Sequence, residues 1–192
     1  MTANFGRRWP GREAAARNEE SADDRPSRAL LSNLPPEERA RQLCLDALER
    51  RMRTRKQLAQ LLARKRVSLE IATPVLDRLQ EVGLINDEAY ARAFIASRQR
   101  SRPRGSRALS SELWAKGIAP DVIERVLVET TEAEDPIQAA RRAVAPKLRQ
   151  LAGKPNDEVR RKIEQFLLRR GFSYETARDV LRDLSDPDDS LA

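Results

Sequence analysis

Apolar residues recur at every third or fourth position through most of this chain, and this spacing predicts amphipathic helices. The first helix is expected to open at Pro35 and Pro36, because proline suits the first turn of a helix. Its apolar stripe runs through Ala40, Leu43, Cys44, Ala47 and Leu48. No stretch alternates between apolar and polar residues with a period of two between turn signals, so we expect no β-sheet. The predicted fold class is therefore all-α.

Residues typical of helix ends divide this pattern into short segments. Side-chain oxygens of Ser, Thr, Asp and Asn accept hydrogen bonds from the free backbone N–H groups of a first helical turn. The candidate N-caps are Thr54, Ser68, Asn86 or Asp87, Asp135 (followed by Pro136) and Ser173, and Gly83, Gly117 and Gly171 are expected to end helices. Pro74 falls inside an expected helix, so that helix either starts at Thr73–Pro74 or is kinked there. Pro146 raises the same question for a later helix.

One three-helix unit occurs three times along the chain. Segments 56–76, 107–127 and 161–181 align without gaps. Their matching apolar positions are Leu58, Leu109 and Ile163; Leu62, Leu113 and Leu167; Val67, Ile118 and Phe172; and Leu76, Leu127 and Leu181. The turn residue after the second helix is Arg66, Gly117 or Gly171, and a basic residue precedes it in every copy (Lys65, Lys116 and Arg170). Such self-similarity is typical of stacked supersecondary units.

We therefore expect three tandem three-helix repeats at 36–84, 85–132 and 135–184, stacked into an elongated, curved array with a continuous core. Residues 1–35 lack periodicity and are expected to form a disordered N-terminal tail, and 185–192 an acidic C-terminal tail. Within the first tail, the stretch Phe5-Gly6-Arg7-Arg8-Trp9 is a candidate anchoring motif; the alternative is that these residues have no role.

Composition narrows the classes of function. The chain has no histidine, which excludes His-based acid–base catalysis and His-containing zinc sites. Its single cysteine, Cys44, lies on an apolar stripe and is expected to be a buried packing residue. No nucleotide-binding glycine loop, CxxC pair or acidic metal cluster is present in the sequence, so we expect a non-enzyme without cofactor or metal. No apolar run is long enough to span a membrane, and a cytoplasmic monomer is expected.

Arginines are the candidate functional residues. The net charge is +7, which indicates an acidic partner such as nucleic acid. The densest group is Arg98, Arg100, Arg102, Arg104 and Arg107, and Arg53, Arg55 and Arg141 lie at comparable places in the other units. Guanidinium groups bind phosphates and carboxylates through paired hydrogen bonds, so we expect a partner- or nucleic-acid-binding surface. The alternative interpretation is a solvated surface that maintains solubility.

Two further features have structural explanations. Lys65, Lys116 and Arg170 fall at expected helix ends, where a cation offsets the helix dipole. Trp114 is expected to pack against a neighbouring unit, and stacking on a base is the alternative. A three-helix unit is also similar to a helix-turn-helix, but the expected third helices, 70–82, 121–130 and 174–184, are rich in acidic residues that would repel phosphate.

The chain resembles the RecX family, the regulators of the RecA recombinase. The resemblance rests on the motif Gly83-Leu84-Ile85-Asn86-Asp87, on Lys116-Gly117-Ile118 and on Arg169-Arg170-Gly171-Phe172, and covers roughly residues 38–184. Between these motifs it continues through Tyr90, Ala91, Phe94, Arg98, Gly105, Arg107, Glu112, Leu113, Ile123, Phe166 and Leu167. Departures are Asn86 in place of Asp, Tyr90 in place of Phe, Arg66 in place of a turn glycine, Pro74, and the long N-terminal tail.

The resemblance implies an all-helical repeat protein that binds the RecA filament on DNA. Such proteins mostly restrain RecA, lowering its ATP hydrolysis, its strand exchange and its promotion of LexA self-cleavage. Three hypotheses follow: a regulator of the RecA filament in recombination, repair and the SOS response, a basic helical-repeat protein that binds nucleic acid without RecA, or a scaffold with no such partner. The family has no catalytic residues to carry over.

Overall fold

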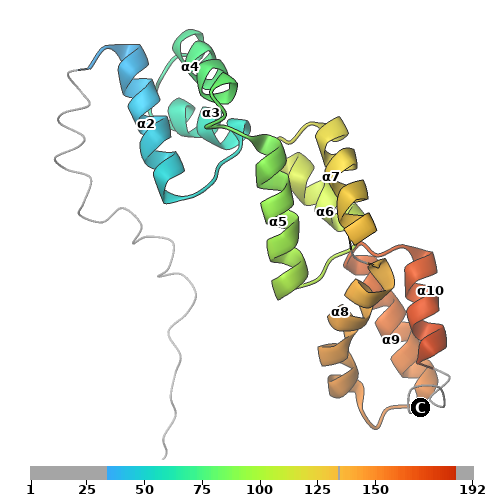
Figure 1. The fold of residues 1–192 in the computed structure, drawn as a ribbon. Coiled ribbons are helices and arrows are strands. Elements are labelled where there is room, and N and C mark those ends of the chain that lie inside the picture. Colours follow the sequence, from blue (N-terminus) through green and yellow to red (C-terminus); the bar gives the residue numbers. More distant parts are fainter. Residues whose placement is uncertain (1–33, 134, 185–192) are drawn as a thin grey trace, which may run out of the picture.

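The computed structural model describes residues 34–133 and 135–184, and this part of the chain is entirely helical (Figure 1). The helices are α2 (Pro36–Arg50), α3 (Arg55–Arg64), α4 (Leu69–Glu81), α5 (Asp87–Ser101), α6 (Ser106–Ala115), α7 (Pro120–Ala133), α8 (Pro136–Leu151), α9 (Asn156–Arg169) and α10 (Tyr174–Asp183). They group as α2–α4, α5–α7 and α8–α10 in an elongated row, which confirms the predicted fold class. The predicted tails lie outside the described residues, apart from Leu34 and Pro35.

Each three-helix unit encloses its own core. The buried residues of the first unit include Leu58, Leu62 and Leu76. Leu109, Leu113 and Ile118 occupy the second core, and Ile163, Leu167 and Phe172 the third. The aligned positions of the repeat are thus the core positions, but the expectation of one continuous core is wrong. The units instead meet through narrow contacts between helix ends.

The predicted helix starts are largely confirmed. Thr54 accepts a hydrogen bond from the backbone of Gln57, whose side chain bonds back to the Thr54 N–H in a capping box. Asn86, Asp135 and Ser173 also cap their helices through their side chains. Ser68 stands at the N-cap position of α4, but its side chain makes no capping bond.

Both interior prolines lie within continuous helices. Helix α4 begins at Leu69 and passes through Pro74, so the alternative start at Thr73–Pro74 is wrong. Pro146 lies in the same way inside α8. Cys44 is fully buried in the first core, and this burial raises the pKa of its thiol to about 11, as expected of a packing residue.

The second helices of the three units lie end to end in the order α9, α6, α3 (Figure 1). At the joint between the second and third units, the N–H of Gly105 donates to the carbonyl of Arg170 at 3.0 Å. At the joint between the first and second units, the Thr54 hydroxyl donates to the carbonyl of Lys116 at 2.8 Å. Each joint therefore satisfies carbonyl groups that a helix C-terminus leaves free.

Helix α5 strengthens the joint between the first and second units. The Asp87 carboxylate accepts a hydrogen bond at 2.9 Å from the backbone N–H of Arg55, at the start of α3. Asp87 thus caps a helix of the preceding unit, while Asn86 caps its own. Burial raises the pKa of Asp87, and the hydrogen bond from Arg55 opposes that shift.

Glycine is required where two units touch. Gly117 and Gly171 have φ angles of +86° and +83°. A Cβ atom at Gly117 would lie 2.5 Å from the Lys56 Cβ, and one at Gly171 would lie 2.4 Å from the Ala108 nitrogen. The repeat therefore has glycine at these positions both for the left-handed backbone and for the close approach of the next unit.

Arg66 is the counterpart of these glycines in the first unit, where no further unit stacks among the described residues. It keeps the left-handed backbone, with a φ angle of 59°. The carbonyl before it, that of Lys65, accepts a 3.5 Å hydrogen bond from the guanidinium of Arg39 instead of from a neighbouring helix end. A side chain is tolerated here because no helix end of another unit in the described ranges packs against the turn.

Arg66→Gly is expected to stabilise the protein by about 1 kcal/mol, because glycine adopts the left-handed backbone without steric penalty. Denaturant unfolding followed by circular dichroism measures the change. Lys65→Gly is the matched control: Lys65 has an ordinary φ angle of −84°, so glycine there should lower stability. Equal losses from both substitutions would contradict a strained backbone at Arg66.

Candidate functional site

One arginine cluster lies at the joint between the second and third units. Arg102 and Arg104 lie between α5 and α6, and Arg170 follows α9. The pKa of Arg170 is lowered first by burial and then by the positive charges of Arg104 and Arg102. Its guanidinium donates to the carbonyl of Pro103 at 3.2 Å and lies 4.7 Å from the ring centre of Phe166. We call these three residues the joint cluster.

Two arginines of the predicted site are held by one carboxylate. Arg98 and Arg104 lie 2.9 and 2.8 Å from the oxygens of Glu112, a half-buried residue of α6. Arg98 also lies over the ring of Phe94, 4.8 Å from its centre. Both side chains therefore tie the α5–α6 segment to α6, and their charges are partly compensated within the chain.

Three other arginines of the predicted site remain open. Arg100, Arg102 and Arg107 are exposed, and their side chains form no ion pair with any residue in the described ranges. Arg102 belongs to the joint cluster itself, and Arg100 and Arg107 flank the cluster at the end of α5 and the start of α6. Their guanidinium groups are the ones available to bind an anionic partner.

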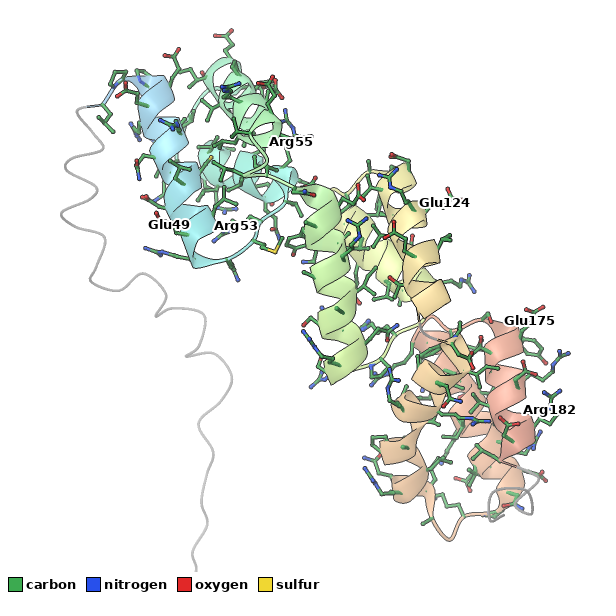
Figure 2. The ribbon with its side chains drawn as sticks, in the orientation of Figure 1. Glu49, Arg53, Arg55, Glu124, Glu175 and Arg182 are labelled. Carbon is green, nitrogen blue, oxygen red and sulfur yellow. The ribbon has the colours of Figure 1, made fainter. Side chains whose placement is uncertain are left out.

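A second cluster lies between α2 and α3 of the first unit. It consists of Arg50, Arg51, Arg53 and Arg64, and we call it the loop cluster. The pKa of Arg53 is lowered by burial and then by the charges of Arg51, Arg64 and Arg50, and its Nε donates to the carbonyl of Ala47 at 3.3 Å. Figure 2 shows Arg53 on one side of the array and Glu124 and Glu175 on the other.

Arg55 and Arg141 lie apart from these clusters. The Arg55 guanidinium binds Asp77 of α4 at 2.6 Å and Gln80 at 3.3 Å, on the side of the unit opposite Arg53 (Figure 2). Arg141 is paired with Asp183 of α10. The structure thus groups arginines into two separate clusters, the loop cluster and the joint cluster, and shows no comparable group around Arg141 within the described residues. That any of these arginines binds a partner stays a prediction.

Two members of the clusters were missed by sequence reasoning. Arg64 joins the loop cluster, although it is eleven positions after Arg53 and on another helix. Arg170 was interpreted only as a helix-end cation, yet it lies beside Arg102 and Arg104. The sequence signal that could have found Arg170 is its alignment with Lys116. Lys116 also lies at a joint between units, and its amino group is 5.1 Å from the ring centre of Phe94.

The expectation that Trp114 packs against a neighbouring unit is wrong. The side chain follows buried Leu113 on α6 but is 67% exposed. Within 34–133 and 135–184, no group of carboxylates and cysteine is arranged to hold a metal ion. In the same ranges, no helix combines the length and the apolar character that crossing a bilayer requires.

The fold and the clusters together define a tandem three-helix repeat protein with arginine groups beside its joints. Family models for the first, second and third three-helix domains of RecX match residues 40–79, 86–127 and 133–181. Regulatory protein RecX of Streptomyces coelicolor is 41% identical over 147 residues, which cover 77% of this chain and 78% of that protein. The chain belongs to the RecX family of regulatory proteins.

Other relatives and solved structures agree. Regulatory protein RecX of Mycolicibacterium smegmatis is 38% identical over 149 residues, covering 76% of this chain and 79% of that protein. A crystal structure of RecX from Lactobacillus salivarius superimposes with a TM-score of 0.68 at 22% identity, covering 78% of this chain and 97% of that one. At this identity the structural likeness supports the fold.

Proposed function

We propose that this protein binds the RecA filament on DNA and restrains its activity. The observation that carries the proposal is the RecX relationship through all three units, at 41% identity to the Streptomyces coelicolor protein. An elongated array suits a long, grooved filament better than a compact partner. The two arginine clusters supply positive charge where such an array would approach DNA phosphates.

The test of this function is the ATP hydrolysis rate of RecA on single-stranded DNA, measured while this protein is added. We expect the rate to fall at amounts far below one copy per RecA, because capping or destabilising a polymer affects many subunits at once. A fall only at amounts that rival the DNA sites would indicate competition for DNA. An unchanged rate would contradict the proposal.

Direct binding to nucleic acid without RecA is the second candidate, and the clusters favour it too. The exposed arginines without ion pairs, Arg100, Arg102 and Arg107, are the residues to neutralise. Arg98 and Arg104 are unsuitable, because removing them would leave Glu112 without partners and disturb the fold.

Replacing Arg100, Arg102 and Arg107 together by alanine is expected to weaken filament binding roughly 10- to 100-fold, because the three contacts with phosphates are lost. The salt dependence of binding should decrease as well, since fewer counterions are released. The matched control replaces Arg41 of the first unit with Arg161 and Arg178 of the third, three exposed arginines outside both clusters. Both variants lose the same charge. Equal binding of the two variants at equal helicity would contradict the site, but not the RecA assignment.

Salt titration separates the two candidates. Binding to bare single-stranded DNA should weaken steeply with salt, because phosphate contacts release counterions. Binding to the RecA filament should retain a component that salt affects less, since part of the interface is with protein. If both titrations have the same slope, DNA binding alone accounts for the interaction.

A further inference from the structure

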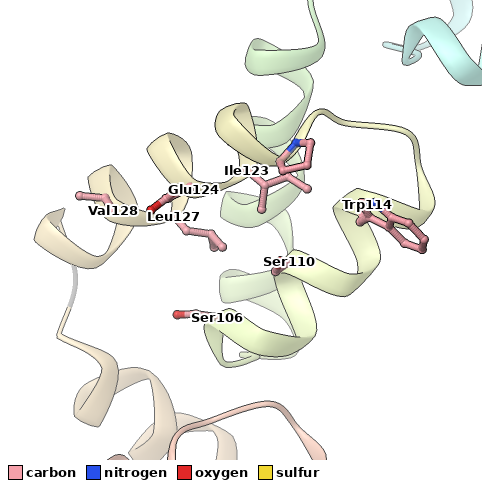
Figure 3. Close-up of a pocket in the computed structure, with 8 residues that line it drawn as sticks. Ser106, Ser110, Trp114, Ile123, Glu124, Leu127 and Val128 are labelled. Carbon is pink, nitrogen blue, oxygen red and sulfur yellow. The ribbon is translucent and has the colours of Figure 1, made fainter.

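An apolar groove runs between α6 and α7 of the second unit. It has a volume of about 540 Å³ and is lined by Ser106, Ser110, Trp114, Ile123, Leu127 and Val128 (Figure 3). Figure 3 shows Trp114 at one end, and Leu127 of α7 pointing toward the α6 residues Ser106 and Ser110. Val128 and Trp114 are 53% and 67% exposed, so the groove presents a large apolar surface to solvent.

The repeat itself explains why the second unit has this groove. In the first unit, the positions of Ser106 and Val128 are occupied by Arg55 and Asp77, whose 2.6 Å ion pair bridges the two helices. In the third unit, Arg160 stands in the place of Ser106 and donates to the carbonyl of Leu181 at 3.2 Å. The second unit instead has a small residue, Ser106, and an apolar residue, Val128, at these two positions, so no polar bridge crosses the groove.

The rim of the groove carries negative charge. Glu124 lies beside the apolar floor, and Asp121 is one turn away on α7. Neither forms an ion pair with a residue of the described ranges, although the chain has a net charge of +7. Glu129, further along α7, is already paired with Arg92. The occupant that fits this groove therefore combines apolar anchors with positive charge.

The chain itself contains such a segment outside the described residues. The stretch Phe5-Gly6-Arg7-Arg8-Trp9 places two aromatic rings on either side of two arginines, in a chain with only 4% aromatic residues. The 25 residues from Trp9 to Leu34 can span up to roughly 80 Å when extended. If each unit is as long as a 15-residue helix, two units in a row measure roughly 40–50 Å. The segment can therefore reach the groove.

We propose that residues 5–9 dock into the α6–α7 groove of the same chain. Phe5 and Trp9 would cover the apolar floor beside Trp114, and Arg7 and Arg8 would pair with Glu124 and Asp121. Because the segment is tethered, its effective concentration is on the order of 1 mM, so weak binding suffices for high occupancy.

Tryptophan fluorescence tests the proposal directly, because Trp9 and Trp114 are the only two tryptophans of the chain. In the full-length variant Trp9→Phe, Trp114 is the sole reporter and an aromatic anchor remains. We expect acrylamide to quench Trp114 about twofold less in this variant than in the double variant Phe5→Ala, Trp9→Ala, where the tethered segment loses its anchors. Equal quenching in the two chains would overturn the proposal.

Two sets of controls, each built on Trp9→Phe, establish the site and the charges. Ser106→Arg with Val128→Asp installs the ion pair of the first unit across the groove. This variant should lose the protection of Trp114 from acrylamide, while its circular dichroism spectrum stays unchanged. Arg7→Glu with Arg8→Glu should also remove the protection, whereas Arg25→Glu with Arg28→Glu, an equal charge change elsewhere in the tail, should not. Protection that disappears on dilution would indicate docking between two copies and would overturn the intramolecular assignment.

Discussion

Replacing Leu113 by alanine is expected to lower the free energy of unfolding by about 2–5 kcal/mol, the range for truncating a fully buried leucine. Leu113 is completely inaccessible and packs in the core of the second unit with Leu109 and Ile118. Alanine removes apolar contacts and leaves a cavity, and an isolated three-helix core has few other residues with which to refill it. Denaturant unfolding of the whole chain gives the value.

Leu69→Ala is the control for this prediction. Leu69 begins α4 and is 78% exposed, so its truncation should change stability by less than about 0.5 kcal/mol. A near-zero effect at Leu113 would mean that the aligned positions of the repeat are not the core positions.

Gly171→Ala is expected to destabilise the chain by about 2–5 kcal/mol, because two penalties act together. The residue has a φ angle of +83°, which costs about 1–2 kcal/mol for a side chain. A methyl group there would lie 2.4 Å from the backbone nitrogen of Ala108, and relieving such a clash typically costs about 1–3 kcal/mol. The joint between the second and third units should therefore loosen.

Gly83→Ala separates the two penalties. Gly83 has a φ angle of +77°, but a Cβ atom there would meet nothing within 4 Å. Its substitution should therefore show the backbone penalty alone. Small-angle X-ray scattering should detect a change of shape only in the Gly171 variant; the same scattering and the same loss of stability in both would show that the joint tolerates a side chain.

Local chemistry made the helices predictable from the sequence. Thr54, Asn86, Asp135 and Ser173 cap helices through bonds to residues two or three positions away, and such bonds depend on little else. The aligned apolar positions became core positions because each unit buries its own stripe. Pro74 remained ambiguous because a single lost hydrogen bond is outweighed by packing on either side of it.

The candidate site was harder to predict, because ion pairs depend on which helices meet. Nothing local indicates that Glu112 of α6 would hold both Arg98 and Arg104, or that Asp77 would hold Arg55. A run of arginines in the sequence thus includes side chains held in ion pairs that support the fold and side chains that are available to bind a partner. The packing of Trp114 was predicted wrongly for a similar reason. Its position directly after buried Leu113 does not indicate whether a neighbouring unit covers its ring.

The turn at Arg66 also bears on whether copies of the chain can associate end to end. A joint that links the end of one second helix to the start of the next is head-to-tail, and such contacts propagate into open fibres unless something ends them. Gly117 and Gly171 leave room for a neighbour, whereas the corresponding position at the end of α3, Arg66, carries a side chain. At the opposite end, α9 starts at Asn156, about one turn earlier relative to the repeat than α3 or α6. Both ends of the described row thus differ from its internal joints, and these differences disfavour the head-to-tail addition of a second copy of the chain.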